Sequence, residues 1–491
     1  MQASQARSFV FEVFFHACMT SAPRAKFAPD RLTMLSFSNP QTKNSKGSMQ
    51  EHSNTSTSPV SRRQFIKSSS LVAASAAAGV SFPYVSRAQA KPPINAVIIG
   101  IGGRGGGAGQ NFLEAAKNVG VEGKIVAVAD LFPEQARRGH EHFQVPEDKC
   151  FSGFDAYKKA LEVPGVNYAI LATPPGFRNI HFKTCVEAGK NIFTEKPVAV
   201  DGPGIRNMYA AAEESKKKGL KVAAGTQRRH QAAYIETIKR IHDGAIGDIT
   251  SLRVYWVNGG PIWHRGDHGD TDLERQIRNW YHYIWLCGDH ICEQHVHNLD
   301  IGNWIMGDHP IKCWGMGARQ QLDGKSGEIW DNFAVEYEYP GGVRMYSYCG
   351  QIKRDWSSVS EAIQGTKGTA NPGGSIQPKG GSMWRYREKA IDPYVQEHMD
   401  LINAIVNNTE LNEAKQVADT TLTAIMGREA AYSGAAVEWD EILNSNFTYG
   451  PELMYSDSSK MEWGPFRTLQ SPMPSRHNIF RSPPELPVAK A

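Results

Sequence analysis

A glycine-rich stretch and a later aspartate carry the chemistry that is most easily inferred from this sequence. The apolar run Ile94–Ile99 leads into Gly100, Gly102 and Gly105, which match the pattern G-x-G-x-x-G. A helical stretch and a second apolar run follow, and the second run ends in Asp130. Strand, glycine turn, helix, strand and terminal acid in this order indicate a dinucleotide site, whereas the glycines alone would be weak evidence.

Each of these residues has a physical task in such a site. Gly100 permits a tight turn, Gly102 lets the backbone approach a pyrophosphate, and Gly105 lets the helix pack closely on the strand. The helix then presents free N–H groups to the phosphates. Asp130 can accept hydrogen bonds from both hydroxyls of the adenosine ribose and would repel a 2′-phosphate, which favours NAD over NADP. A glycine-rich loop without a ligand is the plainer alternative.

A second segment is dense in reactive side chains. It holds His290, Cys292, Glu293, His295 and His297, all of which are metal-ligand types. One interpretation is a metal site, but no further ligand spacing is recognisable, so we expect no metal. We expect His290 and His295 to pack in the core. If the segment is helical, the i, i+4 spacing places Glu293 and His297 on one face.

The elements that must position these residues follow a βαβ pattern. Apolar strand-like runs at 166–171, 191–194 and 221–225 are separated by helical stretches. Such a series predicts a parallel sheet whose ligands lie beyond the carboxyl ends of the strands. The strand ends deliver Thr173 and Pro174, then Glu195 and Lys196, then Gln227.

Several motifs together resemble the Gfo/Idh/MocA oxidoreductases over residues 94–440. These are the glycine-rich turn, Ala172-Thr173-Pro174-Pro175, Glu187-Ala188-Gly189-Lys190, Glu195-Lys196-Pro197 and the later segment 288–300. The resemblance implies the α/β class: an N-terminal Rossmann dinucleotide-binding domain and a C-terminal α+β domain with an open, mostly antiparallel sheet. It also implies that this sheet mediates oligomerisation, as a dimer or tetramer.

The expected domain boundaries follow from these patterns. We expect a leader and signal peptide over 1–90, the Rossmann domain over 91–227, the substrate and oligomerisation domain over 228–440, and an extended C-terminal arm over 441–491. Strand-like runs in the second domain lie at 249–257, 311–320, 333–339 and 343–349, and helical periodicity at 394–407 and 420–431.

The resemblance also implies roles for individual residues. Lys196 matches the lysine that contacts the reacting hydroxyl and the nicotinamide ribose, and His297 matches the usual acid/base. Glu293 stands where the family more often has Asp, so it either orients His297 or binds a substrate hydroxyl. The residues expected at the NAD cofactor are Gly100, Gly102, Gly103, Arg104, Gly105, Asp130, Thr173, Pro174, Glu195, Lys196 and Gln227.

Aromatic and histidine side chains crowd residues 255–285. Aromatic faces suit the C–H surfaces of sugars, so we expect Trp280, Tyr281 and His282 to contact substrate, although about half of such a crowd is expected to be core. Residues 264–268 form a polar loop that could lie over the site. Where the family often has His, this chain has Arg178, which could contact a phosphate, a substrate acid or nothing.

The leader carries the marks of an export signal. Arg62 and Arg63 precede a short, weakly apolar run, and Ala88-Gln89-Ala90 is a small-x-small cleavage pattern. The twin arginines resemble a Tat signal, which implies an exported, periplasmic protein. The apolar run is too short to span a bilayer, so no stable membrane insertion is expected. Met49 stands just before this signal and is the expected start of translation.

Composition excludes several other classes. With 41% hydrophobic and 21% charged residues, the chain is neither a polytopic membrane protein nor mostly disordered. Residues 1–90 hold ten Lys or Arg and three Asp or Glu, so the leader carries the positive charge of the chain (+4 overall) and the rest is close to neutral. No nucleic-acid partner is expected from this charge. None of the seven cysteines forms a C-x-x-C motif.

We therefore expect an exported NAD-dependent oxidoreductase that acts on a sugar, polyol or related polyhydroxy compound. Because no free NAD pool exists outside the cytoplasm, the cofactor should be tightly bound and recycled within one active site. The alternative is an NAD-dependent, redox-neutral glycoside hydrolase that works by transient oxidation and elimination. A non-catalytic sugar-binding protein on the same fold is the third hypothesis, and the presence of Lys196 and His297 argues against it.

Overall fold

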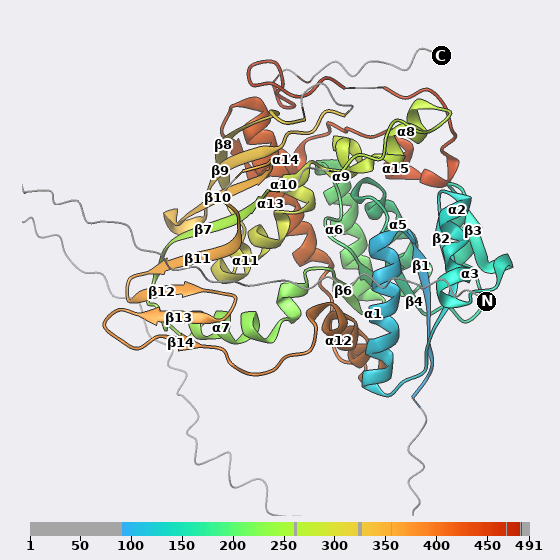
Figure 1. The fold of residues 1–491 in the computed structure, drawn as a ribbon, viewed down its shortest axis with the longest axis horizontal. Helices are drawn as coiled ribbons and strands as arrows, with labels where there is room; N and C mark the ends of the chain where they lie inside the picture. The colour runs from blue at the N-terminus through green and yellow to red at the C-terminus, as the bar shows by residue number, and fades with distance from the viewer. Residues whose placement is uncertain are drawn as a thin grey trace, which may run out of the picture. The chain divides into compact units, whose positions relative to one another are not determined.

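The computed structural model describes residues 91–259, 263–322, 327–354, 356–467, 469–481 and 483. The expected leader and export signal lie outside the described residues. The described chain is built around two β-sheets, one in each half of the molecule (Figure 1).

The first sheet has six parallel strands in the order β3-β2-β1-β4-β5-β6. The strands are β1 (Ile94–Ile99), β2 (Gly123–Asp130), β3 (Cys150–Ser152), β4 (Tyr168–Leu171), β5 (Asn191–Thr194) and β6 (Val222–Ala224). Because β1 lies between β2 and β4, the strand order reverses there, and the carboxyl end of β1 is the place where such sheets bind ligands. The predicted Rossmann sheet is confirmed.

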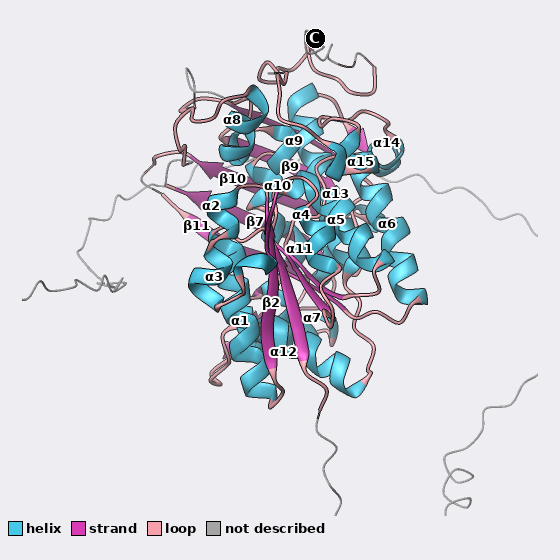
Figure 2. Cartoon of the chain, turned by 90° about the vertical axis from the view of Figure 1, so that its right-hand side faces the viewer, coloured by secondary structure: helices cyan, strands magenta, loops and turns pink. Residues whose placement is uncertain are grey.

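Helices cover both faces of this sheet, so its strands are apolar on both sides. On one face, α1 (Gly103–Val119) and α12 (Pro393–Asn407) bury Phe112 and Leu401 against alternate strand residues such as Ile98. On the other face lie α4 (Ala156–Leu161), α5 (Pro175–Glu187) and α6 (Gly202–Lys217). Figure 2 shows α1 and α6 on opposite sides of the strands.

The edge of the parallel sheet is completed from the far end of the chain. The N–H of Val222 in β6 donates to the carbonyl oxygen of Leu411 at 2.9 Å, and the N–H of Glu413 donates to the carbonyl oxygen of Val222 at 3.0 Å. Residues 393–413 therefore complete the nucleotide-binding half. They supply α12, which packs on the sheet, and a segment that pairs with the edge strand β6. All six strands of the parallel sheet lie before the expected boundary at residue 227, but α12 and residues 411–413, which pack on this sheet, lie after it.

The second sheet has nine strands in the order β14-β13-β12-β11-β7-β10-β9-β8-β15. The strands are β7 (Ile249–Asn258), β8 (Lys312–Ala318), β9 (Asn332–Glu338), β10 (Arg344–Gln351), β11 (Ser358–Gly365), β12 (Gly368–Asn371), β13 (Ser375–Pro378), β14 (Trp384–Arg385) and β15 (Val437–Glu438). Only β7 and β10 pair in parallel; every other described pair in this sheet is antiparallel. The open, mostly antiparallel sheet is thus confirmed.

Helices cover one face of this sheet and leave the other open. On the covered face lie α10 (His290–Glu293), α11 (Val296–Met306) and α13 (Ala414–Ser433), which is buried along most of its length. The remaining helices are α2 (Pro133–Ala136), α3 (Arg138–Phe143), α7 (Ala232–His242), α8 (Asp272–Arg278), α9 (Ile284–Cys287), α14 (Trp439–Asn444) and α15 (Leu453–Ser456). Exposed apolar side chains of the sheet include Met316, Tyr348 and Val359.

The C-terminal segment, residues 441–481, differs from the expected extended arm. It contains few regular elements but packs on its own chain, and in Figure 1 it runs across the top of the molecule towards α2. Tyr449 donates from its hydroxyl to Glu429 at 2.7 Å, Tyr455 donates to Asp201, and Lys158 forms an ion pair with Asp457 at 2.7 Å. These buried and half-buried polar contacts hold the segment against both halves of the molecule.

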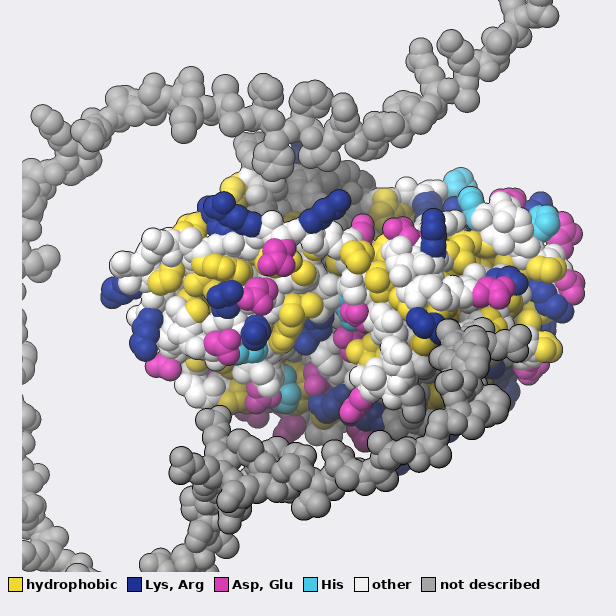
Figure 3. All heavy atoms as spheres, turned by 90° about the horizontal axis from the view of Figure 1, so that it is seen from below, with side chains coloured by type: hydrophobic (Ala, Val, Ile, Leu, Met, Phe, Trp, Pro, Cys, Tyr) yellow, Lys and Arg dark blue, Asp and Glu magenta, His cyan; other side chains and the backbone are white. Residues whose placement is uncertain are grey.

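Charged side chains of both signs are interspersed on one face of the described molecule. On the face in Figure 3, Lys and Arg alternate with Asp and Glu among apolar side chains, which agrees with the near-neutral charge of the chain after its leader. Within the described part of the chain, no helix combines the length and the apolar character that crossing a bilayer requires.

Candidate active site

The glycine-rich turn is shaped by close backbone packing. Gly100 has φ +89°, and a Cβ there would lie 2.7 Å from the backbone nitrogen of Thr173. A Cβ on Gly105 would lie 1.8 Å from the carbonyl oxygen of Gly100, so only glycine lets α1 approach β1 this closely. A Cβ on Gly102 or Gly103 would meet nothing within 4 Å. The start of α1 therefore leaves open space in front of its free N–H groups, which suits a pyrophosphate.

Asp130 faces this turn from the end of β2. Its Oδ2 accepts a hydrogen bond from the Ile101 N–H at 3.0 Å, and its Oδ1 accepts one from the Phe132 N–H at 3.2 Å. Burial raises the pKa of Asp130 to about 6, against the lowering effect of these backbone bonds. The carboxylate is thus held at the carboxyl end of the sheet, where the ribose hydroxyls of a dinucleotide lie.

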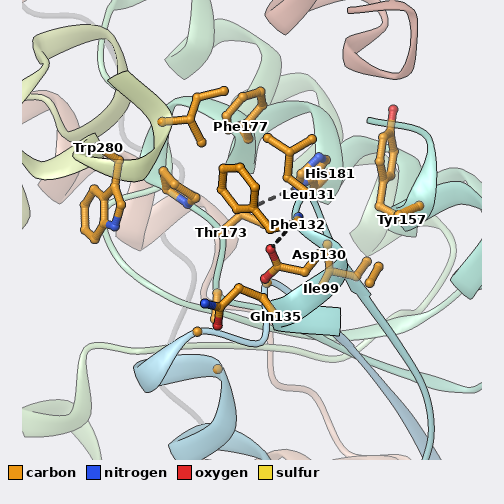
Figure 4. Close-up of a pocket in the computed structure, with 18 of the residues that line it drawn as sticks. Ile99, Asp130, Leu131, Phe132, Gln135, Tyr157, Thr173, Phe177, His181 and Trp280 are labelled. Carbon is orange, nitrogen blue, oxygen red and sulfur yellow. Dashed lines mark hydrogen bonds between the residues drawn. The ribbon is translucent and has the colours of Figure 1, made fainter. Parts of the chain in front are cut away.

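A cavity of about 460 Å³ opens over the turn and Asp130. Figure 4 shows Asp130 and Gln135 at its base, with Trp280 on one side and Tyr157 on the opposite side. The predicted residues that line it are Gly100, Gly102, Gly103, Arg104, Gly105, Asp130, Thr173, Pro174 and Trp280. Its mixed lining and size suit a nucleotide rather than a buried structural void.

Sequence reasoning missed several residues of this cavity. They include Phe132, Gln135, Arg138, Phe154, Tyr157, Phe177, His181 and Ser458. Arg138 lines the cavity and donates to Gln135 at 3.0 Å. The imidazole of His181 lies 3.2 Å from the Thr173 hydroxyl, and burial lowers its pKa to about 3. Apart from Ser458, these positions follow the carboxyl ends of β2, β3 and β4, and no other sequence pattern marked them.

Lys196 and Glu293 form a buried pair that joins the two halves of the molecule. The ammonium of Lys196 donates to the backbone carbonyl oxygen of Glu293, and its Nζ lies 3.2 Å from Oε1 of the same residue. The other carboxylate oxygen of Glu293 accepts from the amide of Gln294. Within the described part of the chain, the ammonium of Lys196 donates to two oxygen atoms, and both belong to Glu293. One of its three N–H groups is therefore left for a ligand.

Glu293 and His297 do not share one helix, contrary to the expected i, i+4 arrangement. α10 ends at Glu293 and α11 begins at Val296, because the chain turns between them. The carboxylate of Glu293 is directed to Lys196 and Gln294 rather than to the imidazole of His297. Glu293 was expected to orient His297 or to bind a substrate hydroxyl. In the structure it holds the ammonium group of Lys196 instead.

His297 is buried, with 7% of its surface exposed, and its ring stacks on that of Trp256 with centroids 5.9 Å apart. Its Nδ1 has no hydrogen-bond partner among the described residues. Burial, followed by the positive charge of Lys196, lowers the pKa of His297 well below its usual value. The imidazole is therefore neutral at ordinary pH and able to accept a proton.

Arg104 and Glu195 are engaged with protein partners. The Nε of Arg104 forms an ion pair with Glu195, and its Nη2 lies 3.1 Å from Glu397 of α12. The guanidinium also lies 4.9 Å from the ring centroid of Tyr394. This cluster fixes the start of α1, the loop that carries Lys196 and the start of α12 relative to one another.

Gln227 and Arg178 also make contacts within the protein. Gln227 donates from its amide to the hydroxyl of Tyr394 at 3.3 Å. Arg178 is buried and donates to the carbonyl oxygen of Pro197 at 2.5 Å, and burial lowers its pKa to about 10. Arg178 thus supports the loop after Lys196, a role that was not among those considered from the sequence.

The three expected substrate residues have different positions. Trp280 lines the cavity over Asp130. Tyr281 is buried and donates to Gln351 at 3.1 Å, and the Nε2 of His282 lies 2.6 Å from the carbonyl oxygen of Trp263. Tyr281 and His282 therefore hold the 263–282 segment in place. That segment places Trp263 and Arg265 at the cavity, as expected for the polar loop.

The side chains at 290–297 are directed to separate partners. His295 Nε2 lies 2.8 Å from the Ser347 hydroxyl, and burial lowers the pKa of His290 to about 4. Among the described residues, no group of three or more His, Cys, Asp or Glu side chains is placed to hold a metal ion.

Comparison with known families matches both halves of the chain. Residues 94–224 match the family described as "Oxidoreductase family, NAD-binding Rossmann fold". Residues 234–371 match "GFO/IDH/MocA C-terminal domain". The matched ranges cover the parallel sheet, α7 and most of the second sheet.

Curated relatives are distant and matched over part of their length. The chain is 28% identical over 166 residues to scyllo-inositol 2-dehydrogenase (NAD(+)) of Bacillus subtilis, which covers 33% of this chain and 42% of that protein. It is 24% identical over 167 residues to a glycosyl hydrolase family 109 protein of Streptomyces coelicolor, covering 33% of this chain and 34% of that one. The match thus spans less than half the length of either relative.

Solved structures share the fold over a larger region. Aldose-aldose oxidoreductase from Caulobacter crescentus, complexed with glycerol, has a TM-score of 0.56 at 20% identity, covering 71% of this chain and 100% of that one. Scyllo-inositol dehydrogenase from Lactobacillus casei, with bound NAD(H) and scyllo-inositol, has a TM-score of 0.55 at 19% identity, covering 71% and 100%. At these identities the likeness establishes the fold.

Proposed function

The chain belongs to the Gfo/Idh/MocA family of oxidoreductases, and from this membership we propose that it is an NAD-dependent dehydrogenase of sugars, polyols or related polyhydroxy compounds. The observation that carries the proposal is the pairing of a buried ammonium with a buried neutral imidazole. Lys196 contacts Glu293, which stands four residues before His297, and its positive charge adds to burial in lowering the pKa of His297. Both side chains are less than 10% exposed.

The residues present fit NAD. The space in front of Gly102 and Gly103 would take the pyrophosphate, and the carboxylate of Asp130 would accept hydrogen bonds from the adenosine ribose. When bound, NAD supplies the acceptor for the hydride that leaves the substrate carbon. The protein's part is to bind the dinucleotide and to manage the proton and the charge on the substrate oxygen.

His297 and Lys196 would share that task. The neutral imidazole of His297 would accept the proton of the substrate hydroxyl, and the remaining N–H of Lys196 would stabilise the negative charge on its oxygen. Glu293 would keep the ammonium in place through two contacts, one from its backbone and one from its carboxylate. Because the site is buried, these charges act in a medium of low dielectric constant and are stronger than in water.

A substrate panel tests the proposal. The purified chain would be incubated with NAD and a series of inositols, aldoses and open-chain polyols, and reduced cofactor would be measured by absorbance and by mass spectrometry of the products. The proposal expects oxidation of at least one polyhydroxy compound. Absence of both bound nucleotide and hydride transfer with every member of the panel would contradict it.

The second candidate is a redox-neutral glycoside hydrolase, which the glycosyl hydrolase family 109 relative favours. In that reaction the same base and ammonium would serve a transient oxidation, and the hydride would return to the sugar. Nitrophenyl glycosides distinguish the two candidates. Release of nitrophenol without net reduced NAD would favour the hydrolase, and net reduced NAD without nitrophenol would favour the dehydrogenase.

We also propose that the protein is exported with its cofactor bound and recycles it within one active site. The support is the twin-arginine pattern at Arg62 and Arg63, because Tat signals carry folded proteins. Replacing both arginines by lysine should retain the protein in the cytoplasm, whereas the wild type should reach the periplasm. Recycling would appear as oxidation of one sugar coupled to reduction of another, with no added NAD.

A homo-oligomer formed through the open face of the nine-stranded sheet is the expected assembly. This face exposes large apolar side chains, with Met316 73% and Tyr348 41% exposed. Sedimentation of the wild type and of Met316→Glu tests the proposed assembly, and a monomer in both proteins would contradict it.

A further inference from the structure

The C-terminal segment reaches the rim of the nucleotide cavity. Ser458 lines the cavity directly, and its hydroxyl lies 3.4 Å from the hydroxyl of Tyr157, another lining residue. Both matched family regions end before this segment, the second at residue 371. The segment lies outside both matched regions and still contributes a residue to the cavity wall.

Trp463 of the same segment packs behind the cavity wall. Its ring stacks on Phe132, with centroids 5.7 Å apart and 23° between the planes, and contacts Phe154 at 4.9 Å. Phe132 comes two residues after Asp130, and Phe154 follows β3; both line the cavity. Trp463 thus holds in place the two aromatic rings nearest to the end of β2, where the adenosine half of a dinucleotide lies.

Arg278 of α8 supports the same ring from the second half of the molecule. Its guanidinium lies 3.9 Å from the ring centroid of Phe132 and forms an ion pair with Glu134 of α2 at 2.8 Å. Phe132 is therefore contacted by the C-terminal segment and by α8, and both elements lie outside the six-stranded sheet. Movement of this ring away from the cavity requires both contacts to open.

Two further contacts fix the segment beside the cavity. Asp457, next to Ser458, forms an ion pair with Lys158 of α4 at 2.7 Å, and this hydrogen bond lowers the pKa of Asp457. The hydroxyl of Tyr455 donates to Asp201, the N-terminal cap of α6. These anchors place 455–463 across the helices that follow β3 and β5.

We propose that the C-terminal segment is part of the nucleotide site and slows release of the adenosine half of NAD. Trp463 is a positioning residue that acts through Phe132 and Phe154, and Ser458 is a direct wall residue. The inference rests on the proposed function, because the cavity must hold a dinucleotide for it to apply. It supplies the physical basis for the retention of NAD that an exported enzyme needs.

The test is the dissociation rate of NAD from the full-length protein. Wild type, Trp463→Ala, Trp463→Phe and Asp457→Asn would be loaded with NAD, freed of excess by gel filtration, and followed by the nucleotide that remains bound with time. Trp463→Ala loses two aromatic contacts, which should speed release about fivefold or more. Trp463→Phe should release NAD within about threefold of the wild-type rate, since a ring remains.

Trp384→Ala is the matched control. Trp384 is a half-exposed tryptophan of β14 with a cation–π contact to Arg240, at the far edge of the other sheet. Its removal should leave the NAD release rate unchanged. Melting temperature measured without nucleotide separates loss of folding from loss of retention, and Asp457→Asn, a change at the surface, provides a second variant that keeps the fold. Asp457→Asn should also speed the release of NAD, because it weakens the ion pair with Lys158.

The outcomes separate this inference from the proposed function. If the wild type binds no NAD, the proposed function fails. If the wild type binds NAD but Trp463→Ala and Asp457→Asn release it at the wild-type rate, the inference is overturned and the proposed function stands. Faster release in both variants, with melting temperatures close to that of the wild type, supports the inference.

Discussion

The indole ring of Trp256 lies on the imidazole ring of His297, with centroids 5.9 Å apart and 25° between the planes. Trp256 belongs to β7 of the large sheet, and His297 is the second residue of α11. The large sheet therefore contributes, through Trp256, to the burial that keeps His297, the proposed base, neutral. The contact also fixes the orientation of the ring, because the Nδ1 of His297 has no hydrogen-bond partner among the described residues.

Replacing Trp256 should change the pH dependence of the reaction. Burial is the largest cause of the low pKa of His297, so Trp256→Leu, which admits water, should raise that pKa. A base must be neutral to act, so the acid limb of kcat/KM should move to higher pH, by about one unit. Trp256→Phe keeps a ring over the imidazole and should leave the limb in place. Identical profiles for all three proteins would rule out this role.

Lys196 and Glu293 should differ sharply in their effect on turnover. Lys196→Met removes the positive charge beside the substrate oxygen, and kcat should fall by about 10²–10³, as for the loss of a donor to a developing oxyanion. Glu293→Gln leaves the backbone carbonyl of residue 293 as an acceptor for Lys196, so the expected loss is about tenfold or less. Steady-state kinetics with the best substrate of the panel gives both values. Equal losses would mean that the carboxylate of Glu293 itself takes part in the reaction.

Binding of NAD should weaken as the pH falls through about 6, the raised pKa of Asp130. The ribose hydroxyls donate to the ionised carboxylate, so NAD prefers the deprotonated form, and protonation below that pKa opposes binding. Calorimetric titration between pH 5 and pH 8 measures the effect. Asp130→Ser should flatten this dependence and reduce the preference for NAD over NADP. A preference that is unchanged in Asp130→Ser would exclude Asp130 as the selecting group.

Removing Arg104 should destabilise the protein more at high pH than at low pH. Burial, followed by the charge of Glu195, raises the pKa of Glu397 well above its usual value, and Arg104 opposes this shift. Without Arg104 the carboxylate of Glu397 is harder to ionise, so the variant loses less stability at low pH, where this carboxylate is protonated. We expect Arg104→Met to lose about 1–2 kcal/mol of unfolding free energy at pH 8, because its side chain is partly exposed, and less at pH 5.5. Urea unfolding at the two pH values checks this.

The sequence was sufficient for the nucleotide-binding half because its signals are local. Gly100, Gly105 and Asp130 are each required by the turn or strand in which they stand, so spacing alone identified them. The alternation of apolar residues likewise identified four of the nine strands of the second sheet. Strands β12 to β14 are two to four residues long and rich in polar residues, so they carry no such alternation.

The sequence could not predict which side chains the fold brings into contact. The choice of Lys196 rather than His297 as the partner of Glu293 depends on a chain turn between two short helices. Nothing in the local pattern around Tyr281 or His282 shows that they support the 263–282 segment while Trp280 lines the cavity. The same holds for Trp463, because its contact with Phe132 joins residues more than three hundred positions apart in the sequence.

The pairing of β6 with residues 411–413 has a consequence for synthesis of the protein. Val222 forms backbone hydrogen bonds with Leu411 and Glu413. The face of the parallel sheet that α1 covers is also covered by α12, which is translated much later. The ribosome must therefore translate almost two hundred further residues after Val222 before the nucleotide-binding half can close. During that interval the β6 edge and part of an apolar sheet face stay uncovered, so a chaperone would have to shield them. The ion pair of Arg104 with Glu397, beside the glycine-rich turn, likewise forms only after α12 has been translated.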